Sequence, residues 1–148
     1  MYFYKSVFKQ YNELSTKSMD LRNKTIAIVE DDLPSLKYYE TLLKNTGAEV
    51  RTFQNGKLFV EYFAIHGGRP DMVIIDFLIP LVNGIDCIRL FRKERKSVPV
   101  LMITGYCSEQ TKTEAYIAGC NEFILKPVPP EKVFFLIGKY FGTEVLAH

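Results

Sequence analysis

The sequence predicts an α/β domain in which a five-stranded parallel sheet carries helices on both faces. From Lys24 onward, short runs rich in β-branched residues alternate with amphipathic helical stretches, a pattern typical of parallel strands joined by crossover helices. The run Met72–Ile75 has no polar alternation, which indicates a strand covered on both faces. The length of 148 residues fits one such domain.

The N-terminal extension, residues 1–22, differs in composition from the rest of the chain. It is polar and basic, and Phe3, Val7, Tyr11 and Leu14 recur at helical spacing, so the sequence predicts a helical linker there. The folded domain is expected to span residues 23–142. Residues 143–148 are expected to form a short tail.

The predicted strands are short runs of apolar and β-branched residues bounded by turn residues. The third follows the loop Gly67–Pro70, and the second is separated from the next helix by Asn55-Gly56. In chain order, the strands are predicted at residues 25–29, 49–53, 72–75, 98–103 and 122–125.

Five helices are predicted between and after these strands. Asp32 is expected to cap the first, which is entered through Pro34, and Gly47 lies just past its end. The last helix is unusually apolar, so part of its surface is expected to contact a protein partner or a second copy of the chain. In chain order, the helices are predicted near residues 34–45, 56–65, 84–95, 108–118 and 130–141.

Composition narrows the classes of function. A net charge of +2 gives no support to a dedicated nucleic-acid binder, which would carry a strongly basic face. No run reaches the ~18 apolar residues that a membrane span needs. Cys87, Cys107 and Cys120 are widely spaced and form no Cys-x-x-Cys pattern, so we expect small, partly buried side chains in a reducing cytoplasm.

Polar residues follow four of the five predicted strands. They are Glu30-Asp31-Asp32, Asp76, Thr104 and Lys126. Because the carboxyl ends of parallel strands lie at one edge of a sheet, these side chains are expected to meet there. Carboxylates gathered in one place repel each other unless cations compensate. Lys126 supplies one positive charge, and the remaining oxygen ligands suit a hard divalent ion, for which Mg²⁺ is the natural choice.

Together these motifs resemble the receiver domain of two-component response regulators. The resemblance implies a flavodoxin-like, doubly wound sheet with strand order 2-1-3-4-5 and a cis peptide between Lys126 and Pro127. It also implies a cytoplasmic phosphorelay role, with a histidine kinase or a histidine phosphotransfer protein as partner. The motifs that carry it are Ile26–Asp32, Asp76–Pro80 with Gly84, Ile103–Gly105, and Lys126-Pro127.

The resemblance implies a role for each acidic position. Asp76 would be the phosphoacceptor, which makes the chain a switch and not an enzyme, with at most self-phosphorylation from small donors and self-dephosphorylation. Mg²⁺ would be held by Asp31, Asp76 and the backbone carbonyl of Leu78, with Glu30 acting through a water. Glu30 stands where aspartate is commoner in the family, and it keeps the acidic group. A cation and a lysine beside the acceptor would reduce the charge that opposes attack on phosphorus.

Further residues would form the switch. By the same resemblance, Thr104 would donate its hydroxyl to a phosphoryl oxygen and Lys126 would pair with the phosphoryl charge. Phe123 falls where the family keeps its switch aromatic. Leu78 and Tyr106 are bulky where many receivers carry polar residues. We therefore hypothesise that they shield the phosphoryl group from water and slow self-dephosphorylation.

Other interpretations differ in what they require of the sequence. The chain could be the receiver segment of a hybrid histidine kinase, or a docking module that is never phosphorylated. A haloacid dehalogenase-type phosphatase needs a second aspartate where Leu78 stands, and a flavodoxin-like electron carrier needs a phosphate-cradling loop after the first strand. His66 and His148 are expected to be exposed without a role, and the basic stretch 89–96 to be a charged outer helix face.

Overall fold

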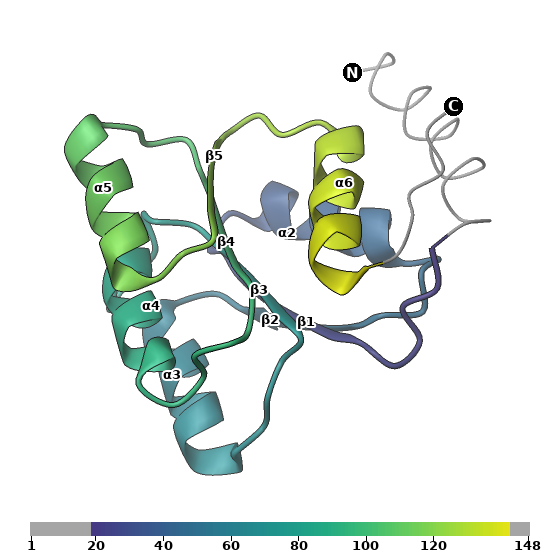
Figure 1. Ribbon diagram of the computed structural model, residues 1–148, viewed down its shortest axis with the longest axis horizontal. Coiled ribbons are helices and arrows are strands. Elements are labelled where there is room, and N and C mark those ends of the chain that lie inside the picture. The colour runs from purple at the N-terminus through teal and green to yellow at the C-terminus, as the bar shows by residue number, and fades with distance from the viewer. Residues whose placement is uncertain (1–18, 143–148) are drawn as a thin grey trace.

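A single parallel sheet with helices on both faces forms the fold in the computed structural model, which describes residues 19–142 (Figure 1). The strand order is β2-β1-β3-β4-β5, so the predicted topology is confirmed. Helices α2 and α6 lie on one side of the sheet, and α3, α4 and α5 lie on the other (Figure 1). The helix predicted in the N-terminal extension falls largely outside the described residues. The strands are β1 (Thr25–Val29), β2 (Glu49–Phe53), β3 (Met72–Ile75), β4 (Val100–Thr104) and β5 (Glu122–Leu125), and the helices are α2 (Leu33–Leu43), α3 (Gly56–His66), α4 (Gly84–Arg92), α5 (Glu109–Ala118) and α6 (Pro130–Phe141).

Four of the five strands have the predicted boundaries, and β4 does not. It begins at Val100 instead of residue 98, because Pro99 has no amide hydrogen to add to the ladder. Helix α2 ends at Leu43 instead of residue 45. At this end of the helix, the Thr46 hydroxyl donates to the Leu43 carbonyl at 2.7 Å. The other helix boundaries agree within one residue except at the end of α4.

Side-chain caps fix where the helices start. Asp32 caps α2 as predicted, because its carboxylate accepts a hydrogen bond from the Ser35 amide at 3.1 Å. Asn55 and Asn83 cap α3 and α4 in the same way. The first turn of α2 is therefore anchored directly beside the carboxyl end of β1, where the acidic motif lies.

Two apolar layers hold the helices to the sheet. The layer under α3, α4 and α5 contains Phe53, Phe59, Phe63 and Phe91, whose rings contact one another in mostly tilted or edge-on pairs. The layer under α2 and α6 is closed by Met19 and Leu21 from the N-terminal side of β1. Burying each large side chain contributes about 1.5–3 kcal/mol. Met19 and Leu21 are therefore part of the apolar layer under α2 and α6.

Arg92 and Arg95 are structural residues, so the prediction that residues 89–96 form a charged outer face is wrong for these two. The Arg92 guanidinium donates to the carbonyls of Gly119, Arg95 and Val98 and to Oδ1 of Asn121, at 2.6–3.0 Å. Helix α4 ends at Arg92 instead of residue 95, because the following amides bond back to carbonyls of the last turn. Arg92 thereby joins the end of α4 to the starts of β4 and β5.

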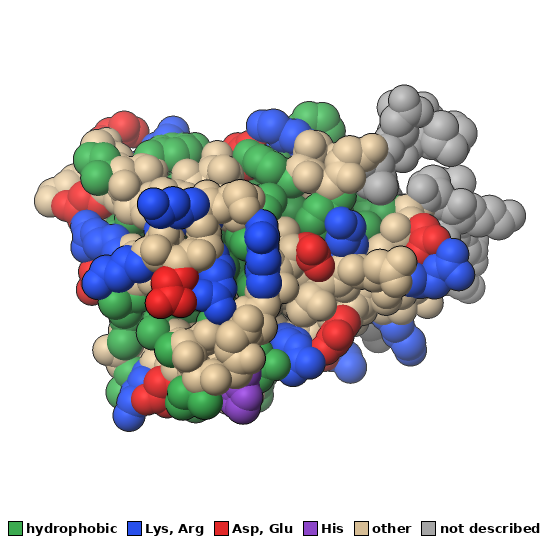
Figure 2. All heavy atoms as spheres, turned by 60° about the horizontal axis from the view of Figure 1, so that its bottom comes forward, with side chains coloured by type: hydrophobic (Ala, Val, Ile, Leu, Met, Phe, Trp, Pro, Cys, Tyr) green, Lys and Arg blue, Asp and Glu red, His purple; other side chains and the backbone are tan. Residues whose placement is uncertain are grey.

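The molecular surface carries charges of both signs. On the face shown in Figure 2, basic and acidic side chains are interspersed with apolar ones. Within residues 19–142, no helix is both long enough and apolar enough to cross a membrane.

Candidate functional site

Four strand ends bring the predicted polar residues to one rim of the sheet. The pairing of Val29 with Ile75 places Glu30 and Asp76 side by side, and the Asp76 amide donates to the Val29 carbonyl at 3.1 Å. Thr104 ends β4, and the Lys126 amide donates to its carbonyl at 2.8 Å. Glu30 is 2% exposed, Asp76 8% and Thr104 0%. Three polar side chains are therefore buried at one edge, which is costly unless each has a partner.

Lys126 is the cation that joins the two buried carboxylates. Its Nζ lies 2.7 Å from Oε2 of Glu30 and 2.9 Å from Oδ2 of Asp76. A longer contact of 3.5 Å reaches Oγ of Ser35 in the first turn of α2. The peptide bond between Lys126 and Pro127 is cis, as the resemblance implied. The ammonium thus compensates both carboxylates at once.

Burial and pairing have opposite effects on the pKa values of Glu30 and Lys126. Burial raises the pKa of Glu30, and the hydrogen bonds from Lys126 and from the Asp32 amide offset this only in part. For Lys126, burial lowers the pKa, but the hydrogen bonds and charges of Glu30 and Asp76 outweigh it, so the pKa is raised. The two carboxylate partners of Lys126 thus outweigh the effect of burial on its pKa, whereas burial dominates the pKa of Glu30.

The acidic rim has the donor chemistry for a divalent cation. The rim holds three carboxylates, those of Glu30, Asp31 and Asp76, against the one ammonium of Lys126, and Asp31 is exposed to solvent. Among the described residues, no three His, Cys, Asp or Glu side chains are arranged as a ready-made metal cluster. Mg²⁺ usually takes one or two carboxylates and keeps several waters, so the residues present fit this ion.

The loop after β3 holds the acceptor strand close to α4. The Gly84 amide donates to the Phe77 carbonyl at 3.0 Å, and a Cβ at Gly84 would clash with the Asp76 carbonyl oxygen. In the same loop, Leu81 adopts φ of 72°, a left-handed conformation that is unfavourable for a branched side chain.

The Asp76 carboxylate is held on both of its oxygens. The Leu78 amide donates to Oδ1 at 3.1 Å, and Lys126 Nζ lies 2.9 Å from Oδ2.

The predicted switch residues lie on the two strands that follow the acceptor strand, with Thr104 at the end of β4 and Phe123 within β5. The hydroxyl of Thr104 accepts a hydrogen bond from the Tyr106 amide at 3.2 Å. The ring of Tyr106 stacks on Phe77 with centroids 5.5 Å apart. Phe123 is half-buried, and its amide donates to the hydroxyl of Tyr116 on α5 at 3.2 Å. No hydrogen bond between Thr104 and Asp76 is present among the described residues.

Leu78 and Tyr106, the proposed shielding residues, are 57% and 45% exposed. They flank the acceptor on the β3–α4 and β4–α5 loops. Their apolar surface is presented to solvent instead of to the core.

Three other predictions have different outcomes. Cys87 and Cys120 are buried, but Cys107 is exposed, so the expectation of three partly buried cysteines is wrong for Cys107. It lies in the loop between β4 and α5. His66 is exposed as expected, and its ring makes a tilted contact with that of Tyr62. His148 lies outside the described residues.

Ser35 and Tyr39 on α2 were not predicted as part of this region. Ser35 contacts Lys126, and Tyr39 is buried behind it. The only sequence feature that pointed to Ser35 is its position three residues after Asp32. The same spacing makes Ser35 the hydrogen-bond partner of the Asp32 cap. Nothing in the sequence distinguished the hydroxyl of Tyr39 from that of an ordinary core tyrosine.

Comparisons with known proteins agree on one family. The family model described as the response regulator receiver domain matches residues 26–137. The polar-differentiation response regulator DivK of Brucella anthropi is 26% identical, over 80% of this chain and 97% of its own length. Hybrid signal transduction histidine kinase M of Dictyostelium discoideum is 30% identical, over 77% of this chain.

Solved structures show the same fold. A putative response regulator from Chloroflexus aurantiacus superposes with a TM-score of 0.73 at 26% identity, covering 80% of this chain and 98% of that one. The receiver domain of a sensor histidine kinase from Pseudomonas aeruginosa, with a magnesium ion coordinated in its active-site cleft, gives 0.72 at 22% identity, covering 81% and 98%. The chain spans 5% of the length of the Dictyostelium kinase and 27% of a transcriptional regulatory protein of Salmonella typhimurium that is 30% identical over 76% of this chain.

Proposed function

The chain belongs to the family of response regulator receiver domains, and from this membership we propose that Asp76 accepts a phosphoryl group from a phosphohistidine of a partner protein. The partner would be a histidine kinase or a histidine phosphotransfer protein. The observation that carries the proposal is the burial of Asp76 at the end of β3, with Lys126 Nζ 2.9 Å from its Oδ2. Such an acceptor is held in place and partly neutralised before the donor arrives.

The chain's own residues supply most of what the transfer needs. A carboxylate oxygen of Asp76 attacks phosphorus, the new P–O bond forms as the P–N bond breaks, and the donor imidazole leaves. Leu78 fixes the carboxylate through its amide, while Lys126 offsets charge as the phosphoryl group approaches. After transfer, Lys126 can remain paired with the phosphoryl oxygens while Glu30 is released from it.

Magnesium fits this proposal as the resident ion. Asp31, Asp76 and the Leu78 carbonyl would hold it, with Glu30 acting through a water. When bound, it would neutralise charge on the phosphoryl oxygens and help to align the donor. The exposed position of Asp31 leaves its carboxylate accessible to such an ion from solvent.

The same site supports a conformational switch that involves Thr104 and Phe123. A phosphoryl group adds charge and acceptor oxygens, which would draw in the Thr104 hydroxyl and break its hydrogen bond with the Tyr106 amide. Movement of Thr104 would make room for Phe123, which is half-buried in its present position. Helix α5, strand β5 and helix α6 would then present a changed face to a downstream protein or to a second copy. The proposed place of action is the cytoplasm.

Mass spectrometry of the intact protein tests the acceptor role. Wild type is incubated with Mg²⁺ and acetyl phosphate or phosphoramidate, and gain of one phosphoryl group is expected. Asp76→Asn should abolish the gain. Asp71→Asn is the matched control, because Asp71 lies before β3, where its carboxylate accepts from the Thr25 amide and an asparagine can do the same. If wild type gains no phosphoryl group with any donor, the acceptor proposal is wrong and a docking module becomes the better interpretation.

A second experiment tests the shielding role of Leu78. Leu78→Asn replaces exposed apolar surface beside the acceptor with a group that can position water. We expect the phosphoryl lifetime, followed by the loss of the added mass, to shorten about threefold to tenfold, equivalent to ~1 kcal/mol in the barrier. Leu58→Asn, an exposed leucine on α3, is the control. An unchanged lifetime in Leu78→Asn would show that Leu78 does not shield.

A further inference from the structure

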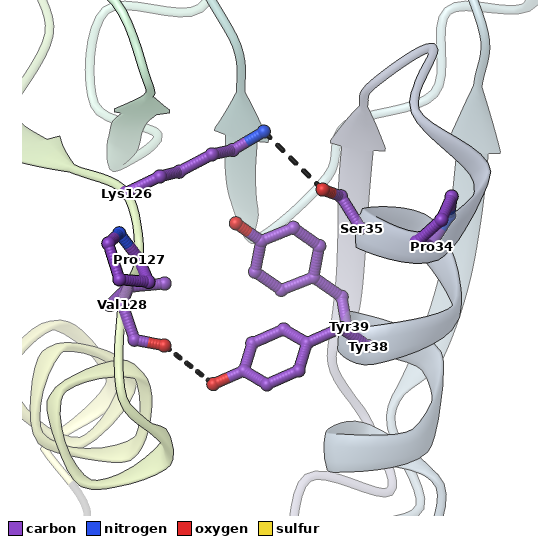
Figure 3. Close-up of a pocket in the computed structure, with 7 residues that line it drawn as sticks. All are labelled: Pro34, Ser35, Tyr38, Tyr39, Lys126, Pro127 and Val128. Atoms are coloured by element: carbon purple, nitrogen blue, oxygen red, sulfur yellow. Dashed lines mark hydrogen bonds between the residues drawn. The ribbon is translucent and has the colours of Figure 1, made fainter. Parts of the chain in front are cut away.

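A cavity of about 460 Å³ lies beside the acceptor site, between the start of α2 and the loop that joins β5 to α6 (Figure 3). This volume falls within the roughly 300–1,000 Å³ typical of small-molecule sites. The cavity shares only Lys126 with the acceptor machinery, and its walls are mainly apolar. Its principal lining residues are Ser35, Tyr38, Tyr39, Lys126, Pro127 and Val128.

Tyr39 places in this cavity a hydroxyl that has no hydrogen-bond partner in the part of the chain that the structure describes. The residue is 2% exposed, and its hydroxyl makes no hydrogen bond with any of residues 19–142. Figure 3 shows that hydroxyl directed into the space between α2 and the segment Lys126-Pro127. The neighbouring Tyr38 instead donates to the Val128 carbonyl at 2.6 Å. A buried hydroxyl is nearly always paired, so an unpaired one indicates a missing partner.

The chemistry of the walls limits what that partner can be. Among the described residues, Lys126 is the one charged residue that lines the cavity, and its ammonium is already bound to Glu30 and Asp76. A negatively charged ligand would therefore lack a free counter-charge and would be costly to bury. Burial raises the pKa of Tyr39, so its hydroxyl stays protonated and can donate at neutral pH. The tyrosine and proline rings offer flat surfaces to an aromatic group.

We propose that the cavity between α2 and the β5–α6 loop binds a small, uncharged aromatic molecule whose single polar group pairs with the Tyr39 hydroxyl. Because Lys126 forms part of the wall, such a ligand lies next to the acceptor without contacting it. The inference is independent of phosphoryl transfer, because binding requires only the unphosphorylated protein.

Binding of 2-naphthol to ¹⁵N-labelled full-length protein tests the proposal. Titration followed by amide chemical shifts should show saturable changes at Tyr38, Tyr39, Lys126 and Val128. Tyr39→Phe keeps the ring and removes the hydroxyl, so the Kd should rise about threefold to tenfold. 2-Naphthalenesulfonate, which has the same ring system with a charge, should bind at least about tenfold more weakly than 2-naphthol.

Stability separates a ligand site from a purely structural tyrosine. An unpaired hydroxyl disfavours folding, so Tyr39→Phe should have a Tm equal to or above that of wild type. Tyr62→Phe, a half-buried tyrosine on α3, is the control and should leave 2-naphthol binding unchanged. A lower Tm in Tyr39→Phe would mean that the hydroxyl has a structural partner, and the proposal would be wrong. Absence of saturable binding, or shifts confined to residues outside the cavity lining, would also overturn it.

Discussion

Replacing Lys126 by methionine removes the charge that the two buried carboxylates share. The side chain loses charge-assisted hydrogen bonds of 2.7 Å to Glu30 and 2.9 Å to Asp76. Such bonds contribute about 1.5–3 kcal/mol each, and breaking a buried ion pair costs about 3–5 kcal/mol. Because the Lys126 side chain is 23% exposed, water recovers part of this, and we expect a loss of about 2–4 kcal/mol.

Urea unfolding at neutral pH with a chelator present measures this loss. The chelator is needed because a divalent cation could replace the missing charge. With a slope of about 2 kcal/mol per molar urea, the midpoint should fall by about 1–2 M. Adding Glu30→Gln to Lys126→Met removes one uncompensated charge and should restore about half of the loss, whereas Lys112→Met on the exposed side of α5 should change stability by less than about 0.5 kcal/mol. A loss below about 0.5 kcal/mol for Lys126→Met, or no recovery in the double variant, would refute the reasoning.

Three further predictions concern groups at and away from the site. Burial raises the pKa of Glu30 in the folded protein, so its contribution to stability is complete below its unfolded pKa near 4.5 and is lost as pH rises through the folded pKa. In urea unfolding, Glu30→Gln should therefore be as stable as wild type at about pH 4 and more stable than wild type at about pH 7. Equal stability of the two proteins at both pH values would contradict this. Arg92→Ala should lower the free energy of unfolding by about 2–4 kcal/mol because three carbonyls lose their donor, whereas Arg89→Ala, which removes an exposed ion pair, should cost less than about 0.5 kcal/mol. A thiol reagent should modify Cys107 alone in the native protein, because burial raises the pKa of the other two thiols to about 12 and about 11, and rapid modification of a second thiol would show that the buried cysteines are accessible.

The sheet and its polar rim could be predicted from the sequence because both follow from local patterns. Apolar runs mark the strands, and parallel pairing brings their carboxyl ends to one edge, so the proximity of Glu30, Asp76 and Lys126 required no knowledge of individual contacts. The start of β4 was misplaced because Val98 is apolar and buried although it precedes the ladder. Burial and hydrogen bonding are separate properties, and the apolar pattern reports only the first.

The role of Arg92 could not be predicted for a different reason. An arginine on a helix is usually solvated, and the sequence around it reads as a charged face. Its partners include Gly119 and Asn121, which reach it only after α5 has packed beside α4. The hydroxyl of Tyr39 is a similar case, since the position fits the apolar stripe of α2 and only the folded chain shows that no group within residues 19–142 accepts a hydrogen bond from it.

The Tyr116 hydroxyl limits how another chain can attach to β5. Edge strands attract extended segments, which join a sheet through main-chain hydrogen bonds and can lead to aggregation. At Phe123 the amide is already engaged by Tyr116, so an incoming strand would first have to displace that side chain. Protein recognition at this edge must then rely on side chains such as those of Ile117 and Leu125, which are 77% and 52% exposed. A partner protein that binds this edge would therefore recognise how α5 lies against β5, and it would not bind by extending the sheet.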